Sequence, residues 1–553
     1  MPNTDILKRK GFSEEEISKL EQVCLGTESI LYDEFSLSDH RTKVADELDA
    51  NAKLKRRMHA ISPAEGRYDR YAEKLHGIVS EFAWVKKRVM IEVEYLIALT
   101  DELHGNYRGE KRPLTSRKFT EQERDRLRGL YRNFNEDDFR RIQLLDRHIQ
   151  HDIVAMTTWI VYELGDSMGD LKESVETALH FALTSNDINQ NVYNMTVKEI
   201  MKECFIPTVV ELQETILDKV SSEDDVVFAG QTHGQYAEYT TLRKVFANWA
   251  DAVSQTLVNY LSEEGPVNLP GKLGGAVGNN SDLLAAYPDL YDYLQFNFLH
   301  KEFIKKILGL EYTKMCDQPE FGVKNQELYD SIVRTNNVLI KVCQDFWDYC
   351  SRGLFRKKTK PGESGSSVMA QKANPWLSEG AEEAFTQANA GFRGFERMLK
   401  YRMQGDLRRS LLMRSIGEHF ARTLVAMKRL TQELNKYDPN YVAIAREVEE
   451  HPEMSAAAVQ TILRREGIPE AYDLIKEITM GKPIKVGHYQ KLADQLQKSA
   501  TITQRVKKEI IFLVTHPEEN TGYAKLYADE AISNARDVCG CLKEAYGINK
   551  EVS

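Results

Sequence analysis

Residues 361–375 read PGESGSSVMAQKANP and join a loop rich in glycine and serine to the start of a helix. Asn374 is a good helix cap, Pro375 suits the first helical position, and Glu379 falls in the first turn. The glycines let the backbone approach a ligand closely. We therefore expect the serines and the lysine of this stretch to lie on a loop that feeds a helix.

The side chains of this loop suit a bound carboxylate. Ser366 and Ser367 supply hydroxyls, while Lys372 and Asn374 supply a cation and an amide near a helix N-terminus. Such a set forms an anion site with a nucleophile or base beside it. Composition alone leaves open a mobile loop with an exposed lysine. The spacing of a P-loop is absent, which argues against that class of phosphate site.

The segments on either side of the loop repeat apolar residues at helical spacing, and convincing strand alternation is scarce. We therefore predict an all-α fold built on a long central helical bundle. The repeating residues are Leu328, Ile332, Leu339, Val342, Phe346 and Cys350 in one helix, Phe420, Leu424, Met427 and Leu434 in a second, and Phe82, Val85, Val89 and Val93 in a stretch from Arg70 to Leu103.

The length of 553 residues suggests several domains, because a domain averages about 150 residues. Ser13 and Glu16 read as a capping box, which predicts a short helix ending at Gly26. We expect a mostly helical N-terminal appendage at 1–60, an N-terminal helical domain at 61–172, a central helical-bundle domain at 173–438 and a C-terminal helical domain at 439–553.

The composition is that of a soluble globular protein. Lys and Arg number 74 against 84 Asp and Glu, a net charge of −10, which argues against a general binder of nucleic acid or anionic membranes. No apolar run reaches the roughly 18 residues of a membrane span, and no apolar signal-peptide stretch follows the first charges. We expect a cytoplasmic protein that binds neither nucleic acid nor membrane.

The cysteines and histidines give no metal pattern. Seven cysteines lie scattered without a paired framework, as expected of reduced thiols. Cys539 and Cys541 form a C-x-C pair without a further cysteine or histidine cluster nearby, so free thiols on a helix face are the simpler interpretation. We expect no metal, no structural zinc and no cofactor.

Two histidines lie in segments that can carry chemistry. His233 lies in GQTHGQ at 230–235, a tight loop before a helical stretch, where it can act as a general acid near neutral pH. The alternative is a structural histidine that only donates and accepts hydrogen bonds. His151, followed by Asp152, is equally typical of a helix-surface or capping pair.

Taken in order, these motifs resemble the fumarase and aspartase superfamily and, within it, the adenylosuccinate lyases. The superfamily loop G-S-S-x-M-P-x-K-x-N-P corresponds to GSSVMAQKANP at 365–375. The resemblance covers the chain from about residue 60 to the C-terminal region. The more specific segments are ISPAEGRY at 61–68, QHDIVA at 150–155, HFALTSNDIN at 180–189, GQTHGQYAEYTTLRK at 230–244, and GGAVGNN ahead of AAYP at 285–288.

The resemblance implies a role for each matching residue. Ser366 corresponds to the base that removes the β-proton of a succinyl group, and His233 to the acid that protonates the departing nitrogen. The implied substrate contacts are Lys372, Asn374 and Gln318 for the succinyl carboxylates, Arg67, Tyr68, Ser410 and Arg414 for the phosphate, and Gln150, His151, Asp152, Thr184, Ser185, Thr232 and Ser367 elsewhere in the pocket.

The resemblance also implies an activity and an assembly. The expected reaction is elimination of fumarate from adenylosuccinate, giving AMP, and from the succinyl-carboxamide ribotide of purine synthesis. The expected enzyme is a three-domain homotetramer whose bundles form a multi-helix core and whose active sites, shared between subunits, take an anionic small molecule. Another succinyl-amine lyase, such as an argininosuccinate lyase, and a non-catalytic scaffold remain alternatives.

The sequence departs from the family at a few positions. Ala370 replaces the proline of the loop, a loosening worth up to about 1 kcal/mol, and Gln371 stands where these lyases often have histidine. Gly405 replaces an arginine expected near the phosphate, a loss of about 1.5 to 3 kcal/mol if nothing compensates. Arg408 and Arg409 follow it. They either restore the charge from another direction or indicate a different anionic substrate.

Overall fold

The computed structural model describes residues 8–9, 13–14, 17–18, 65–105, 107, 109–220, 225–262, 265–291, 299–358, 369, 373–481 and 483–548. Helices predominate among them, so the prediction of an all-α fold is confirmed. The helix predicted between Ser13 and Gly26 lies almost entirely outside the described residues.

The chain divides into two compact units. Unit 1 comprises Met1–Phe205, Val267–Asp330 and Ala390–Ala421, and unit 2 comprises Ile206–Pro266, Ser331–Asn389 and Arg422–Ser553. Three long helices contain residues of both units. These are α16 (Val323–Ser351), α17 (Trp376–Gly394) and α19 (Ile416–Lys436). The expected domain boundaries near residues 60, 172 and 438 stay predictions.

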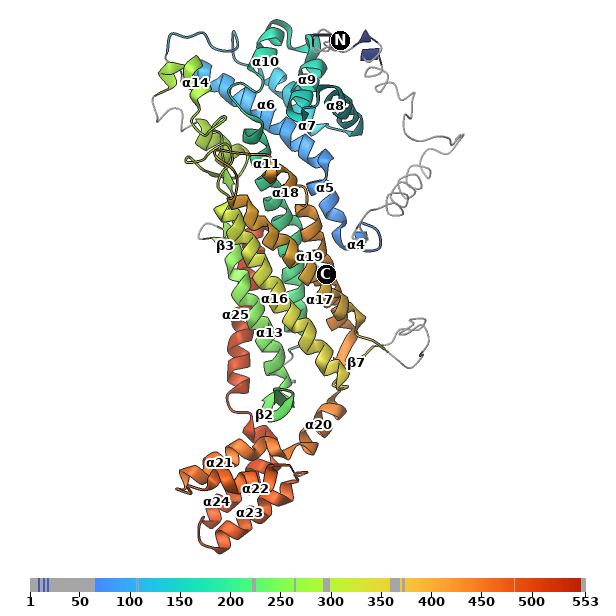
Figure 1. The fold of residues 1–553 in the computed structure, drawn as a ribbon, viewed down its shortest axis with the longest axis vertical. Coiled ribbons are helices and arrows are strands. Elements are labelled where there is room, and N and C mark those ends of the chain that lie inside the picture. The colour runs from blue at the N-terminus through green and yellow to red at the C-terminus, as the bar shows by residue number, and fades with distance from the viewer. Residues whose placement is uncertain are drawn as a thin grey trace. The chain divides into compact units, whose positions relative to one another are not determined.

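Unit 1 is built around α6 and α11, which contact each other (Figure 1). Helix α6 buries residues on several of its sides, and these include the charged side chains of Arg88 and Glu92 as well as apolar ones. The elements wholly within the unit are α4 (Asp69–Ala72), α5 (His76–Val79), α6 (Glu81–Gly105), α7 (Glu121–Arg132), α8 (Glu136–Ile149), α9 (Asp152–Leu164), α10 (Lys172–Ala178), α11 (Ser185–Ile200), α14 (Ser281–Ala286), α18 (Arg408–Met413), β5 (Pro270–Gly271) and β6 (Glu311–Tyr312).

The stretch from Arg70 to Leu103, predicted as one periodic segment, is not one helix. It forms α4, a 3₁₀ turn, α5 and then α6, with Ser80 extended (ψ 156°) between the last two. The Ser80 hydroxyl accepts the N–H of Ala83 at 3.2 Å. This is the bond of a helix N-cap, which competes with continuation of the preceding helix.

Helix α11 buries several polar side chains along one face, in addition to apolar ones. Asp187, Asn191 and Asn194 recur on one face and are all buried. Asn194 donates to the carbonyl of Pro270 at 2.6 Å, and Asn191 donates to the carbonyl of Lys272 at 2.8 Å. Because buried polar groups need partners, this face fixes the backbone of the 270–275 segment, which also pairs as β5 with β6.

Unit 2 is a bundle of long helices followed by a group of shorter ones (Figure 1). In the bundle, α25 packs on α12 and α13. The helices wholly within the unit are α12 (Ile206–Asp218), α13 (Leu242–Leu257), α20 (Tyr441–Glu450), α21 (Ala456–Arg465), α22 (Ala471–Thr479), α23 (Val486–Lys498), α24 (Gln504–Thr515) and α25 (Ala524–Tyr546); the strands are β1 (Val227–Thr232), β2 (Gln235–Thr241), β3 (Leu261–Ser262), β4 (Gly265–Pro266), β7 (Phe355–Lys357) and β8 (Tyr437–Pro439).

The glycine-rich segment at 230–235 is part of a β-hairpin rather than a simple loop. Strands β1 and β2 pair in antiparallel register, and His233 and Gly234 form the turn with φ of 55° and 71°. Two central residues with positive φ match the twist of a hairpin, and glycine adopts this conformation readily. The hairpin packs on α20 through Ala229, Tyr239 and Val448.

The described helices include none with both the length and the apolar character that crossing a bilayer demands. Likewise, the described His, Cys, Asp and Glu side chains do not gather into a group of three or more that could hold a metal ion.

Candidate functional site

Unfavourable backbone conformations gather in the motif segments. Seven described residues other than glycine have positive φ, and six of them lie in or beside these segments. A left-handed conformation costs such residues roughly 1–2 kcal/mol and persists only where surrounding contacts impose it. Strain of this kind clusters at functional sites. The six are Gln150, His180, Ala182, His233, Asn280 and Met403.

Asp187 connects two of these segments in unit 1. Its Oδ1 lies 2.8 Å from Lys272 Nζ, and both side chains have no exposed surface. The N–H groups of Gly274 and Gly275 donate to its two oxygens at 2.8 and 3.0 Å. Its Oδ2 also accepts the N–H of Thr184 at 2.9 Å. One buried carboxylate therefore ties the start of α11 to the 270–275 backbone.

Thr184 and Ser185 thus stand at a helix start whose position is fixed. Thr184 is the N-cap of α11, its hydroxyl donates to Asp187 at 3.2 Å, and Ser185 is the first helical residue. Helix α11 has 16 residues, and a helix N-terminus favours negative charge. Both residues are half-buried and can contact an anionic ligand.

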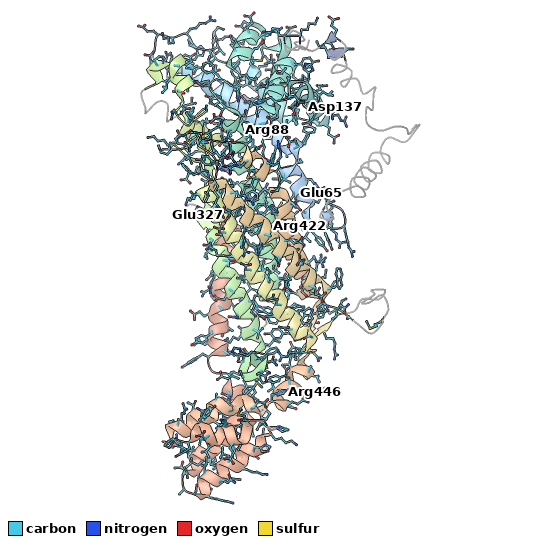
Figure 2. The ribbon with its side chains drawn as sticks, in the orientation of Figure 1. Glu65, Arg88, Asp137, Glu327, Arg422 and Arg446 are labelled. Atoms are coloured by element: carbon cyan, nitrogen blue, oxygen red, sulfur yellow. The ribbon has the colours of Figure 1, made fainter. Side chains whose placement is uncertain are left out.

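A cavity of about 220 Å³ in unit 1 joins two residues that the sequence singled out, Asp152 and Arg414. Arg88 of α6 also lines this cavity, as labelled in Figure 2, and only 2% of its surface is exposed. Its guanidinium lies 3.3 Å from Asp152 Oδ2 and donates to Asn189 at 2.9 Å. Arg88 therefore holds Asp152 against the start of α11.

The cavity carries charges of both signs. Asp146 lies in its lining with Asp152 and Glu81. Partial burial and the negative charges of Asp152 and Glu81 raise the pKa of Asp146. Two guanidinium groups, those of Arg88 and Arg414, face these carboxylates. The site can therefore bind a ligand with both an anionic group and hydroxyl donors.

Ser410 does not line this cavity but precedes one of its lining residues, Arg414, by four positions in the sequence. It is on α18, and Tyr193 of α11 donates to its hydroxyl at 3.2 Å. Burial raises the pKa of the Tyr193 phenol, while its bond to Ser410 and the charges of Arg88 and Arg414 oppose the rise. Tyr193 thus stays a neutral donor, and the Ser410 hydroxyl keeps its own proton for a ligand.

Gln150 and His151 form the junction between α8 and α9. Gln150 is the C-cap of α8 and donates to the carbonyl of Arg147 at 2.7 Å. His151 is the N-cap of α9, and its Nδ1 accepts the N–H of Val154 at 3.4 Å. His151 is therefore held as a helix cap, one of the interpretations that the sequence left open. Because the residue is exposed, its Nε2 can still contact a ligand.

Arg67 and Tyr68 lie in the turn before α4 and do not line the cavity. Gln318 is half-buried in another part of unit 1, where its N–H donates to the carbonyl of Gln404 at 2.9 Å. Its side chain lies against Gly405.

The other expected site residues belong to unit 2 or lie outside the described residues. Thr232 ends β1, and His233 is exposed at the hairpin turn. Asn374 is half-buried, and α17 begins at Trp376, one residue later than the sequence predicted. Outside the described residues lie three expected site residues, Ser366, Ser367 and Lys372, together with Ala370 and Gln371, which depart from the family pattern.

Arg409, one of the two arginines that follow Gly405, is engaged by the protein itself. It is buried and donates to the carbonyls of Met398 at 2.7 Å and Phe321 at 3.2 Å. Arg408 is exposed and donates to Asp406 at 2.7 Å. The guanidinium of Arg409 thus holds two backbone segments together, while the charge of Arg408 is already paired at the surface.

Sequence reasoning missed Asp187, Lys272 and Arg88 as parts of the site. Asp187 follows Thr184 by three residues, the spacing of a capping box, which was a usable signal. A fully buried lysine has no comparable signal, because its partner is 85 residues away in sequence and pairing needs the folded chain.

Comparisons with known proteins identify the family of the chain. The family described as Lyase matches residues 66–388, and the family described as Adenylosuccinate lyase C-terminal matches residues 401–513. The adenylosuccinate lyase of Legionella pneumophila (strain Corby) is 32% identical over 472 residues, covering 84% of this chain and 97% of the relative. That of Dictyostelium discoideum is 31% identical, covering 82% and 94%.

Solved structures share the fold at low identity. A 3-carboxy-cis,cis-muconate lactonizing enzyme from Pseudomonas putida matches with a TM-score of 0.64 and 14% identity, covering 85% of this chain and 99% of that chain. A fumarate lyase from Mesorhizobium sp. BNC1 matches with a TM-score of 0.63 and 15% identity, covering 84% and 98%. The predicted fumarase and aspartase type of fold is confirmed. Because both family matches and full-length relatives agree with the ordered motifs, the chain belongs to the adenylosuccinate lyase family of carbon–nitrogen lyases.

Proposed function

We propose that the chain eliminates fumarate from adenylosuccinate to give AMP, and from the succinyl-carboxamide ribotide by the same chemistry. The observation that supports this most directly is the cavity lined by Asp152, Arg88 and Arg414, the last of which follows Ser410 by four residues. A guanidinium and a hydroxyl donor suit a phosphate, and the carboxylates suit ribose hydroxyls or a purine amine. The substrate needs both kinds of contact.

The proposed chemistry divides two proton transfers between two residues. Ser366, as its alkoxide, takes the β-proton of the succinyl group, and the electron pair forms the double bond of fumarate. The carbon–nitrogen bond breaks, and His233 gives its proton to the departing nitrogen. In this assignment, Lys372, Asn374 and Gln318 hold the succinyl carboxylates, where negative charge grows in the transition state.

The remaining contacts are proposed to bind the nucleotide. Ser410 and Arg414, with Arg67 and Tyr68, take the phosphate. Helix N-termini and uncharged polar side chains complete the pocket, because they stabilise anions without a net charge of their own, and a carboxylate accepts from the hydroxyl or amine groups of the nucleotide. The uncharged set is Gln150, His151, Thr184, Ser185, Thr232 and Ser367, and the carboxylate is that of Asp152.

We also propose a cytoplasmic homotetramer whose subunits share active sites. Support comes from His233, which is exposed at the tip of its hairpin. A general acid in open water gains little from positioning and competes with solvent. A neighbouring subunit that covers the hairpin would exclude that water. Sizing by light scattering tests the assembly independently of activity.

The decisive experiment mixes the purified protein with adenylosuccinate and measures fumarate and AMP. Equal amounts of the two products support the proposal, and cleavage of argininosuccinate instead would overturn it. Ser366→Ala and His233→Ala should each lower kcat by about 10²- to 10⁴-fold while leaving assembly unchanged. His516→Ala, at a half-buried histidine after α24 that is outside the expected site, serves as the matched control with unchanged kcat.

A further inference from the structure

Gly405, which stands where the family has arginine, packs directly against Gln318. A Cβ atom added to Gly405 would lie 2.6 Å from Gln318 Oε1, 3.0 Å from its Cβ and 3.3 Å from its Cδ. Carbon atoms in favourable contact are about 3.5 to 4.0 Å apart. Any side chain at 405 therefore excludes the conformation that Gln318 adopts.

The backbone at Gly405 does not itself require glycine. Its φ is not among the positive values of the described glycines, and only positive φ gives glycine a conformational advantage. The three atoms nearest to an added Cβ all belong to the Gln318 side chain. A substitution at 405 therefore tests the contact with the Gln318 side chain and does not strain the backbone at 405.

Gln318 cannot avoid a new side chain by moving its backbone. Its N–H donates to the carbonyl of Gln404 at 2.9 Å, next to Gly405. One residue earlier, Asp317 accepts the hydroxyl of Tyr401 at 2.8 Å. The two segments are therefore cross-linked on the N-terminal side of the contact.

Hydrogen bonds also hold the two segments on the C-terminal side of the contact between Gly405 and Gln318. Asp406 accepts the N–H groups of Arg402 at 3.1 Å and Arg408 at 3.0 Å, which closes the turn around Gly405. Arg409 donates to the carbonyl of Phe321 at 3.2 Å, beyond Gln318. With backbone fixed on both sides, only the Gln318 side chain can yield.

We propose that Gly405 is a positioning residue for Gln318. The missing side chain at 405 admits the carboxamide of Gln318 and so sets where this amide meets a substrate carboxylate. The ligand in this inference rests on the proposed function, whereas the positioning rests on the contact geometry. Returning the family's arginine at 405 therefore displaces Gln318 and impairs the enzyme instead of restoring a phosphate contact.

Kinetics of two variants test this on adenylosuccinate. Gly405→Ala should raise KM about tenfold through loss of one amide contact, and it should also lower kcat, because negative charge grows on the succinyl carboxylate in the transition state. Gly405→Arg should raise KM at least as much. A Gly405→Arg variant with a lower KM than wild type would overturn the inference, as would an unchanged KM in Gly405→Ala.

A double variant separates positioning from simple structural damage. Gln318→Ala alone should raise KM about tenfold. If Gly405 acts through Gln318, then Gly405→Ala adds nothing further in the Gln318→Ala background. Independent roles would instead multiply to about a hundredfold, and that result would overturn the inference. Gly394→Ala, where an added Cβ meets no atom within 4 Å, is the matched control with unchanged KM.

Crystal structures of wild type and Gly405→Ala give a readout that does not depend on activity. The Gln318 carboxamide should lie against Gly405 in the wild type and take another rotamer in the variant. An unmoved Gln318 overturns the inference whether or not the protein cleaves adenylosuccinate. Conversely, a wild type that releases no fumarate overturns the proposed function, while the rotamer change still supports positioning.

Discussion

Two buried carboxylates, Asp187 in unit 1 and Glu433 in unit 2, each hold a segment next to expected site residues. They differ in the partners that they bind. Asp187 in unit 1 pairs with the Lys272 ammonium at 2.8 Å and accepts the amides of Gly274 and Gly275. Glu433 of α19 in unit 2 is 2% exposed and accepts the N–H of Leu377 at 3.2 Å, in the first turn of α17.

The difference in neutralisation gives the two carboxylates different consequences. Burial raises the pKa of Glu433 to about 7, against the opposing effects of the Leu377 amide and of Lys357, Lys436 and Arg429. Asp187 has a cation in direct contact, so its charge is compensated where it is buried. We infer that the 270–275 segment is held by a carboxylate with a cation in direct contact, whereas the start of α17 is held by a carboxyl group that titrates near neutral pH.

Removing the Asp187 carboxylate should cause the largest loss of stability among the changes considered. Asp187→Ala leaves Lys272 charged, buried and without its partner, which should destabilise the fold by about 3 to 5 kcal/mol. Urea unfolding followed by circular dichroism measures the loss. Asp330→Ala, at an exposed position of α16, is the control and should change stability by less than about 0.5 kcal/mol.

A second variant keeps this test informative if Asp187→Ala does not fold. Asp187→Asn with Lys272→Met removes both charges and should recover most of the lost stability, because the uncompensated ammonium is gone. A double variant as unstable as Asp187→Ala would show that the ion pair is not the source of the loss.

Glu433 should produce a smaller, pH-dependent effect. Its pKa in the folded protein, about 7, exceeds the unfolded value near 4.5, so the folded state binds more protons between these values. Stability from this group is complete below pH 4.5 and is lost as pH rises through 7, by on the order of 3 kcal/mol. Glu433→Gln should remove that loss and unfold at higher urea than wild type at pH 8.

The measurement compares wild type and Glu433→Gln at pH 5 and pH 8. The two proteins should be similar at pH 5, where the carboxyl is protonated, because glutamine retains an acceptor for the Leu377 N–H. A difference of equal size at both pH values would contradict titration of Glu433 as the cause.

Local periodicity was enough to predict the long helices. Leu328 and Ile332 of α16 and Phe420 and Leu424 of α19 are buried as the apolar spacing indicated. The break at Ser80 was missed because apolar spacing continues across it, and only the hydroxyl bond to the backbone distinguishes a cap from an interior serine.

The site was predictable as a set of motifs but not as a geometry. The ordered segments identified Asp152, Ser410 and Arg414, yet the sequence could not show that Arg88 holds Asp152. Nor could it show that Arg409 is directed to backbone carbonyls instead of an anion. Arg88 and Asp152 are far apart in sequence, as are Arg409 and Phe321, and for such pairs spacing along the chain carries no signal.

The smallest expected effect compares the two threonine caps. Thr184 of α11 donates to Asp187, whereas Thr241 of α13 accepts the N–H of Lys244 at 3.1 Å. Thr184→Ala and Thr241→Ala should each destabilise the fold by about 1 kcal/mol. Because Thr184 acts through a shared carboxylate, its loss should shrink by half or more in an Asp187→Asn background, while that of Thr241 should simply add. Urea titration of the four proteins in each cycle measures this coupling. Additive losses at Thr184 would mean that its cap works independently of Asp187 and that the carboxylate does not unite the start of α11 with the 270–275 segment.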